Sequence, residues 1–299
     1  MSNASQSPQA LLVTIDVEIA PDRDFDQQRR SLVNLAEALD GVPSTFFVTA
    51  DAADAFSAEL QLVAAKGHEI GCHGLDHSPL DDYATLTMED ALQRLQEAAG
   101  RITSSTGSPV RAFRGPRMTT SAGTQSVLRR IGFSSDFSVC AHRGDFLCAS
   151  RYRKEWFGLK PRPYAPEYGS AFTPLRAGRD NSLLAVPLSG FVLPFLSGSL
   201  YILGRTIFKR FASFLTWHAR RSHAPIVYLL HSYEFAELSG DEGQRPWHHR
   251  LYGVCPLERY TANLDLISFL TGPCRLVPQT ASMFVDGYWR TQDGRTQSA

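Results

Sequence analysis

Short apolar runs of strand type alternate along this chain with stretches in which apolar side chains recur every three or four positions. The run at residues 11–15 is typical of a buried strand, and Leu32, Leu35 and Leu39 after it have helical spacing. The pattern predicts strands at residues 11–15, 44–48, 68–73, 110–113, 133–138, 183–187, 226–230 and 275–278, and helices at residues 31–39, 52–65, 87–105, 122–131, 205–220 and 257–270.

Strands that alternate with helices form parallel sheets with right-handed crossovers. We expect an α/β barrel of this kind, irregular or incomplete, because reactive side chains follow several of the strands. In barrels of parallel strands the carboxyl ends converge on one mouth. A chain of 299 residues is long enough to form such a barrel as one domain. We place the catalytic domain at residues 11–285, between a flexible N-terminus at 1–10 and a polar, frayed tail at 286–299.

Composition and charge exclude several protein classes. Lys plus Arg and Asp plus Glu number 30 each, so there is no basic surplus to indicate nucleic-acid binding. Five cysteines without a CxxC pair favour a reducing compartment. The first nine residues lack the pattern of a secretory signal, and no apolar run is long enough to span a bilayer. We expect a cytoplasmic protein that could work at the inner face of the membrane.

Candidate metal ligands follow the first and third predicted strands. His73 and His77 are four residues apart, a spacing that lets two imidazoles reach one metal ion if the segment turns as a helix does. Asp16 and Glu18 offer two carboxylates near the same mouth. A hydrolytic metal site needs two or three protein ligands, an open position for water and a base beside that water. Either pair alone is more often structural, and their joint placement favours a metal site.

Further polar residues end other predicted strands. Arg114 could hold a carboxylate with its fork of donors, although a surface salt bridge is the ordinary alternative. Asp136 lies in or just after the fifth strand. His231 ends a later one, where a general acid could stand, and an isolated histidine there is about as often structural. Polar clusters at five strand ends together predict an active site.

The ordered set resembles the polysaccharide deacetylase family (NodB homology, carbohydrate esterase family 4) over roughly residues 11–278. Five segments resemble the successive family motifs, in order Thr14-Ile-Asp16, His73 to His77, Arg114-Gly-Pro-Arg117, Asp136 and Leu230-His231. The resemblance implies a seven-stranded barrel of the NodB type. It also implies a divalent metal, zinc in our prediction, held by Glu18, His73 and His77.

The same resemblance implies a division of roles. Asp16 would be the base and Arg114 would orient it, whereas His231 would be the acid and Asp136 would orient that histidine. A backbone N–H near Arg117 would stabilise the oxyanion. The expected reaction removes an N-acetyl group from an amino sugar of a bacterial envelope polysaccharide or of its lipid- or nucleotide-linked precursor.

Several positions depart from the family pattern. The usual adjacent aspartates are replaced by Asp16-Val-Glu18, so the base and the ligand could be exchanged. Gly74 stands where a Ser or Thr is common, Arg117 replaces an aromatic residue, and the tryptophan of the fourth motif is missing. Segments such as His231-Ser-Tyr-Glu234 resemble the branch linked to exopolysaccharide and cell-envelope sugars, which favours such substrates over chitin.

Three alternatives remain open from the sequence. The enzyme could be a deformylase acting on a lipid-linked formamido sugar, a metal-free amidohydrolase, or a glycan-binding protein with this fold and no activity. The basic amphipathic segment 205–217 is expected to be a crossover helix packed on the barrel rather than a membrane contact, which stays the less favoured interpretation. The Arg-rich stretch 143–162 could recognise a phosphate or an acidic sugar, although a solvated loop is the simpler expectation.

Overall fold

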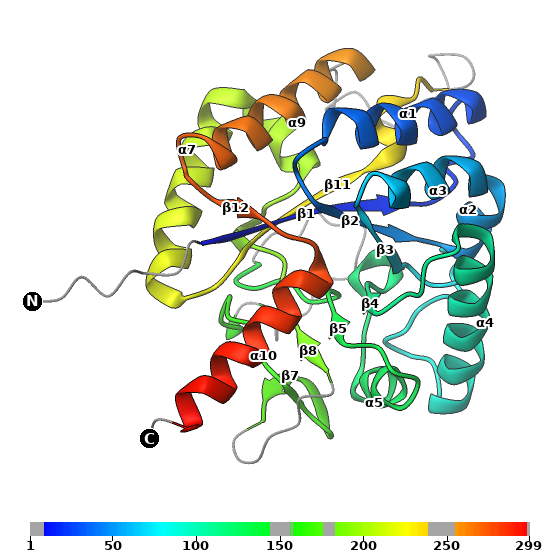
Figure 1. Cartoon of the computed structure of the whole chain (residues 1–299), viewed down its shortest axis with the longest axis vertical. Coiled ribbons are helices and arrows are strands. Elements are labelled where there is room, and N and C mark those ends of the chain that lie inside the picture. The colour runs from blue at the N-terminus through cyan, green and yellow to red at the C-terminus, as the bar shows by residue number, and fades with distance from the viewer. Residues whose placement is uncertain (1–8, 144–155, 157, 176–182, 239–254, 298–299) are drawn as a thin grey trace, which may run out of the picture.

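The computed structural model describes residues 9–143, 156, 158–175, 183–238 and 255–297. Seven parallel strands form one sheet, and a short eighth strand, β12 (Val277–Pro278), pairs with the first. The seven are β1 (Ala10–Val17), β2 (Ser44–Val48), β3 (Glu69–Cys72), β4 (Ala112–Phe113), β5 (Ser135–Asp136), β8 (Leu184–Ala185) and β11 (Ile226–His231). Their order, β11-β1-β2-β3-β4-β5-β8, curls into an open, irregular barrel (Figure 1). The predicted fold class, an incomplete (β/α) barrel in a single domain, is confirmed.

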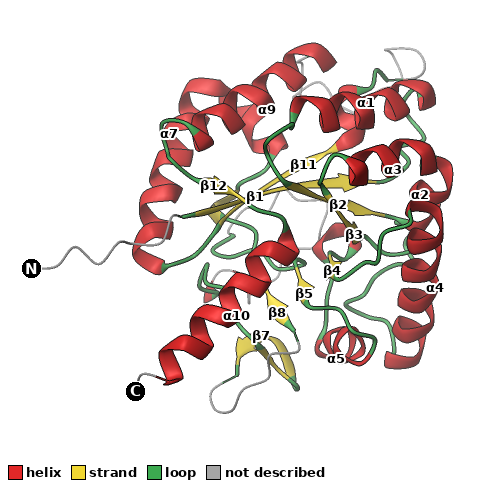
Figure 2. Cartoon of the chain, in the orientation of Figure 1, coloured by secondary structure: helices red, strands yellow, loops and turns green. Residues whose placement is uncertain are grey.

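Helices cover the outer side of this sheet (Figure 2). They are α1 (Phe25–Ala38), α2 (Ala50–Ala55), α3 (Ser57–Ala65), α4 (Met88–Thr106), α5 (Ala122–Arg130), α7 (Ser197–Ser222) and α9 (Pro256–Thr271). A further helix, α10 (Ala281–Gln297), follows β12. Two short hairpins, β6 (Pro166–Glu167) with β7 (Ser170–Pro174) and β9 (Gly190–Phe191) with β10 (Leu193–Pro194), lie outside the main sheet. Two 3-10 turns, η1 (Pro116–Met118) and η2 (Ser232–Phe235), follow β4 and β11.

The opening between the edge strands β8 and β11 is spanned by irregular chain. Leu188 N donates to Val139 O at 2.7 Å on one side, and Leu229 N donates to Phe195 O at 3.2 Å on the other. On the β8 side of this opening the strands β4, β5 and β8 are only two residues long, shorter than the apolar runs predicted, whereas β11 on the other side has six residues. The barrel therefore has regular walls in its first half and loop-built walls in its second.

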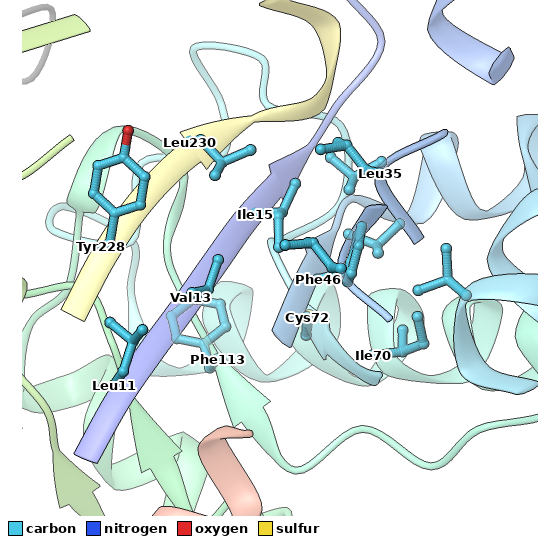
Figure 3. Packing of buried hydrophobic residues seen from close by; sticks show 14 of the residues in the cluster. Leu11, Val13, Ile15, Leu35, Phe46, Ile70, Cys72, Phe113, Tyr228 and Leu230 are labelled. Carbon is cyan, nitrogen blue, oxygen red and sulfur yellow. The ribbon is translucent and has the colours of Figure 1, made fainter. Parts of the chain in front are cut away.

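The alternation of side chains along each strand divides the core into two parts. Leu11, Val13 and Ile15 of β1 face the helices and belong to the larger apolar cluster (Figure 3). Leu12 points to the opposite side of β1 and belongs to a second cluster, which fills the barrel interior and includes Phe47 and Phe137. The interior is thus a packed core, and polar chemistry is confined to the ends of the strands.

The segment predicted as a frayed tail from Asp286 is helical, which corrects that expectation. Helix α10 begins at Ala281 and inserts Ala281 and Val285 into the interior cluster. Its first turn is held by Glu69, whose carboxylate accepts a hydrogen bond from Ser282 N at 2.8 Å. A carboxylate is favourable at a helix N-terminus. These contacts place α10 across the amino-terminal end of the barrel.

The helices predicted from the sequence agree with the structure in part. Thr87 caps α4 as expected, accepting a hydrogen bond from Asp90 N at 3.1 Å. The single helix predicted at 52–65 is instead two, because the chain breaks at the buried Phe56. Helix α7 begins earlier than predicted and is kinked at Gly204. Most of the Arg-rich stretch 143–162 lies outside the described residues. Within them, no helix has the length and apolar character to cross a membrane.

Candidate active site

Six of the predicted site residues meet at the carboxyl ends of the strands. Asp16 is the second-last residue of β1, and it pairs in register with His231, the last residue of β11. Glu18 follows β1 directly, His73 follows β3 and Arg114 follows β4, and these strands lie in one parallel sheet. The parallel arrangement therefore brings residues more than 200 positions apart to one mouth. The remaining sequence-predicted residue, Asp136, faces elsewhere.

Glu18, His73 and His77 converge as a potential metal-binding triad. One ligand atom from each lies within 4.8 Å of the other two. Glu18 Oε2 lies 2.8 Å from His77 Nε2 and 4.0 Å from His73 Nε2. Although it is close to both imidazoles, this buried oxygen accepts no well-aligned hydrogen bond from the described residues. Two imidazole nitrogens and a carboxylate oxygen are a common donor set for a divalent cation such as zinc. The residues present fit that group.

The protonation of His73 suits a metal ligand. Its Nδ1 lies 2.8 Å from the carbonyl oxygen of Arg114, and donation of its N–H to that oxygen leaves Nε2 with a free lone pair. Burial lowers the pKa of His73 below its usual value, although Asp16 opposes the shift. For Glu18 burial raises the pKa, but the neighbouring His77 and His73 outweigh it and the pKa is lowered overall. A neutral imidazole and an ionised carboxylate are the forms that bind metal.

The loop that carries both histidines is organised by Asp81. Its Oδ2 accepts hydrogen bonds from the backbone N–H groups of Leu75, Asp76 and His77 at 2.6, 3.2 and 3.4 Å. Its Oδ1 accepts one from Arg94 Nε of α4 at 3.0 Å, and the aspartate is fully buried. One carboxylate thus ties three successive backbone donors of the loop to a helix of the scaffold.

The same carboxylate explains the glycine at position 74. Gly74 has φ +83°, and a Cβ there would lie 2.5 Å from Asp81 Oδ2 and 3.0 Å from Pro116 Cγ. The position where the family commonly has a hydroxyl side chain is therefore filled by the side chain of a residue seven positions later. Nothing in the sequence marked Asp81, because its role depends on a loop conformation rather than on a motif.

Arg117, which stands in place of the family aromatic residue, also holds this loop. Its Nη1 donates to His77 O at 2.9 Å and its Nη2 donates to Ser78 O at 2.8 Å. Arg117 itself adopts φ +54°. The guanidinium is committed to backbone carbonyls, so this side chain is not a stacking platform for a sugar.

Asp16 is fixed beside the triad by Arg114. Arg114 Nη1 donates to Asp16 Oδ1 at 2.7 Å, and Nη2 donates to Thr14 Oγ1 at 2.9 Å. The guanidinium is fully buried and lies 4.4 Å from the ring centre of Phe47. Burial raises the pKa of Asp16, but Arg114 and His73 outweigh this and hold it below its usual value. The other oxygen, Oδ2, lies 3.7 Å from His73 Nε2 and faces the mouth.

His231 is held by a carboxylate that the sequence argument did not assign. Its Nδ1 lies 3.0 Å from Glu234 Oε1, which also accepts a hydrogen bond from Ser197 Oγ at 2.7 Å. Tyr201 donates to Glu234 Oε2 at 2.8 Å. Burial lowers the pKa of His231, but the hydrogen bond and charge of Glu234 outweigh it and raise that pKa to about 9. The spacing of three residues between His231 and Glu234 is the signal that could have identified this pair.

The prediction that Asp136 orients His231 is wrong. Asp136 is fully buried and accepts hydrogen bonds from Thr120 Oγ1 at 2.8 Å and Gln125 Nε2 at 2.9 Å. Strand alternation explains the difference, since the next residue, Phe137, fills the barrel interior and Asp136 points outward under α5. Asp136 also accepts from Ser138 Oγ, which in turn accepts a hydrogen bond from Gly115 N. Its position supports the loop after β4 rather than the acid.

Comparison with known proteins supports the resemblance found in the motifs. The family model for polysaccharide deacetylases matches residues 25–135, which include His73, His77 and Arg114 but exclude Asp16, Glu18 and His231. No curated protein sequence matches the chain.

Solved structures share the fold over most of the chain. Two proteins provisionally described as polysaccharide deacetylases are similar. The one from Mycobacterium smegmatis has 16% identity, coverage of 97% of this chain and 93% of that one, and a TM-score of 0.61. The one from Pseudomonas aeruginosa PAO1 has 15% identity, coverage of 94% and 90%, and a TM-score of 0.59.

A third structure shows that activity does not follow from this fold alone. It is a mutant, with restored activity, of a carbohydrate esterase family 4 pseudoenzyme from Bacillus anthracis. It has 12% identity, coverage of 93% of this chain and 68% of that one, and a TM-score of 0.51. Function must therefore be argued from the residues of the site. In sequence over residues 25–135 and in fold over nearly its whole length, the chain is similar to the polysaccharide deacetylase family, and the resemblance predicted from its motifs is confirmed.

Proposed function

We propose that this protein is a metal-dependent hydrolase that removes the N-acetyl group from an amino sugar. The observation that carries the proposal is the meeting of three units at one mouth. They are the Glu18–His73–His77 triad, the Asp16–Arg114 pair and the His231–Glu234 pair. A hydrolase of this class needs a cation, a base and an acid around one carbonyl, and each unit is chemically suited to one of those parts.

The triad would hold the divalent cation, which we propose to be zinc. When bound, such an ion supplies a Lewis acid that activates water and polarises the carbonyl of the amide. Asp16 Oδ2 would accept the proton of the attacking water, because Arg114 occupies its other oxygen and leaves Oδ2 toward the mouth. Asp16 and Glu18 both lie on this side, and we assign the base to Asp16 because Arg114, rather than an imidazole, is its closest charged partner.

His231 would supply the proton that the departing amine requires. Glu234 at Nδ1 keeps the imidazole protonated at neutral pH and leaves the other ring nitrogen free to face the substrate. A charged acid poised opposite an ionised base is the arrangement that acyl transfer from an amide needs, since the amine leaves only when it is protonated. We further propose that a backbone N–H near Arg117 stabilises the developing oxyanion.

The proposed substrate is an N-acetylated amino sugar of a bacterial envelope polysaccharide or of a lipid- or nucleotide-linked precursor. This rests on the family resemblance and on segments such as His231-Ser-Tyr-Glu234. The arginine at position 117 is tied to the loop, so recognition of the sugar must use other groups of the mouth.

Metal analysis and product analysis together test the proposal. The purified protein should contain close to one divalent cation per chain and should release acetate from acetylated amino-sugar precursors. Removal of the cation by a chelator should abolish release, and zinc should restore it. Formate in place of acetate would identify a deformylase. A protein that neither binds a cation nor releases either acid would contradict the proposal in favour of a glycan-binding role.

A further inference from the structure

Helix α7 presents a second face that the barrel does not use. Its inner side buries Phe208, Ala212 and Leu215 against the sheet, as expected of a crossover helix. On the outer side Ile207, Arg210, Phe214, Trp217 and Arg221 recur at helical spacing, and all five are exposed. Ile207 is 54%, Phe214 38% and Trp217 51% exposed. The outer side of a helix on a soluble barrel is ordinarily polar, so this stripe requires an explanation.

The β9–β10 hairpin extends the stripe. Phe191 and Val192 are 46% and 51% exposed, and the ring of Phe191 lies 5.2 Å from that of Phe214. Val192 has φ +65°, a strained conformation for a β-branched residue, and its N–H donates to His142 O at 2.9 Å. The hairpin therefore holds an aliphatic side chain in solvent beside the aromatic ones. We call the surface formed by Phe191, Val192, Ile207, Phe214 and Trp217 the α7 patch.

The acidic and basic residues of helix α7, which carries most of the α7 patch, are all basic. Helix α7 has no Asp or Glu in its 26 residues. Arg221 lies 3.7 Å from the ring centre of Trp217, and within the part of the chain that the structure describes neither Arg210 nor Arg221 is ion-paired with a carboxylate. A twofold contact between two copies through this helix would set arginines against arginines. A negatively charged partner is favoured instead.

We propose that the α7 patch docks this protein on an anionic lipid surface. Tryptophan, phenylalanine and arginine side by side on one helix face are suited to the boundary between acyl chains and headgroups. There the rings enter the apolar layer and the guanidinium groups meet phosphates. Docking along α7 would also have a consequence for the site. The first turns of α7 carry Ser197 and Tyr201, which hold Glu234, so the mouth lies at one end of the docked helix.

Vesicle sedimentation of the full chain tests the proposal. The protein should bind vesicles that contain phosphatidylglycerol, bind weakly or not at all to vesicles of phosphatidylcholine alone, and release as the salt concentration rises. Arg210→Gln with Arg221→Gln should weaken binding by about fivefold per arginine. Phe214→Ser with Trp217→Ser should weaken it by more than about tenfold, because the apolar area that enters the lipid is lost.

Matched controls change exposed apolar and arginine side chains on other helices. Leu62 and Met283 are exposed apolar side chains on other helices, and Arg30 and Arg130 are exposed arginines. Leu62→Ser with Met283→Ser, and Arg30→Gln with Arg130→Gln, should bind vesicles as the unchanged protein does, with thermal unfolding showing that every variant is folded. Failure of the unchanged protein to bind anionic vesicles would overturn the proposal. So would equal losses in patch and control variants, or a dimer in solution that only the patch variants dissociate.

Discussion

The proposed metal side and the proposed acid side of the site each hold a histidine at a strand end, and the two histidines differ in the partner of their Nδ1 atoms. On the metal side the partner of His73 is a backbone carbonyl, and the imidazole is almost fully buried. On the acid side the partner of His231 is the carboxylate of Glu234, and the imidazole is partly exposed. A carbonyl fixes the ring without stabilising its positive charge, whereas a carboxylate stabilises that charge. The partner thus suits His73 to the proposed role of a neutral ligand and His231 to the proposed role of a charged acid.

Removal of a ligand should have the largest effect. In His73→Ala the cation site loses one of its three donors, so metal content should fall to trace and turnover to background. Elemental analysis and acetate release measure the two. His223→Asn is a suitable control, because His223 is exposed and has φ +51°, which asparagine tolerates. Stoichiometric metal in purified His73→Ala would remove the triad from the proposed site.

Removal of the acid should separate the two sides. His231→Ala should lower kcat by about 10² to 10⁴, the usual contribution of a general acid, while metal content stays the same. The combination of full metal with low turnover distinguishes this variant from His73→Ala. Turnover equal to that of the unchanged protein would show that another group protonates the amine.

Exchange of the acid's partner should shift a pKa rather than remove a group. In Glu234→Gln the pKa of His231 should fall from about 9 toward its ordinary value, which NMR titration of the metal-free protein measures. Activity should then decline at lower pH, with a loss of about thirtyfold at pH 8 if the pKa returns to about 6.5.

The His231–Glu234 pair also makes the free energy of unfolding depend on pH. Because the folded-state pKa of His231 is raised, its stabilisation is present below the unfolded pKa near 6.5 and is lost as pH rises through about 9. Chemical unfolding at a series of pH values should show this decline in the unchanged protein and a smaller one in Glu234→Gln. An unshifted pKa in the variant would mean that Glu234 does not stabilise the imidazolium.

The smallest effect on maximal turnover is expected for a change in the support of the proposed metal-binding loop. In Asp81→Asn the carboxylate that orders the backbone of Leu75 to His77 is weakened, so metal affinity should fall by about 10- to 100-fold, a typical cost of losing an outer support of a metal site. Excess cation should recover turnover, as measured by metal titration of activity. Asp82→Asn changes the neighbouring, partly exposed carboxylate and should bind metal normally. Equal affinities in both variants would show that Asp81 does not support the loop.

The sequence predicted the parts of the site that follow long regular strands. Asp16, His73 and His231 adjoin β1, β3 and β11, whose apolar runs were visible, and parallel pairing then placed them at one mouth. The role predicted for Asp136 was taken from its place in the order of motifs, whereas alternation with the interior-facing Phe137 points Asp136 outward under α5. Asp81 and Glu234 act through turns, where a contact depends on backbone conformation that apolar spacing does not encode.

Helix α10 was missed although its sequence carries a helical pattern. Its apolar residues recur at helical spacing and pack in or against the interior cluster, namely Ala281, Phe284, Val285, Tyr288 and Trp289. The expectation of a frayed tail rested on the polar character of the residues after Asp286 and did not take this spacing into account. The boundary expected at residue 285 therefore falls inside a structural element.

That helix determines where the chain can be shortened. Truncation at residue 285 would remove Tyr288 and Trp289, which pack against the interior cluster that contains Phe47 and Phe137. The guanidinium of Arg114 lies over the ring of Phe47, so we expect looser packing of this cluster to expose Arg114 to more water. Solvent around Arg114 would weaken its attraction for Asp16, since the energy of a charge pair falls as the surrounding dielectric constant rises. We therefore expect helix α10 to protect the buried Arg114–Asp16 ion pair indirectly, through the packed interior of the barrel.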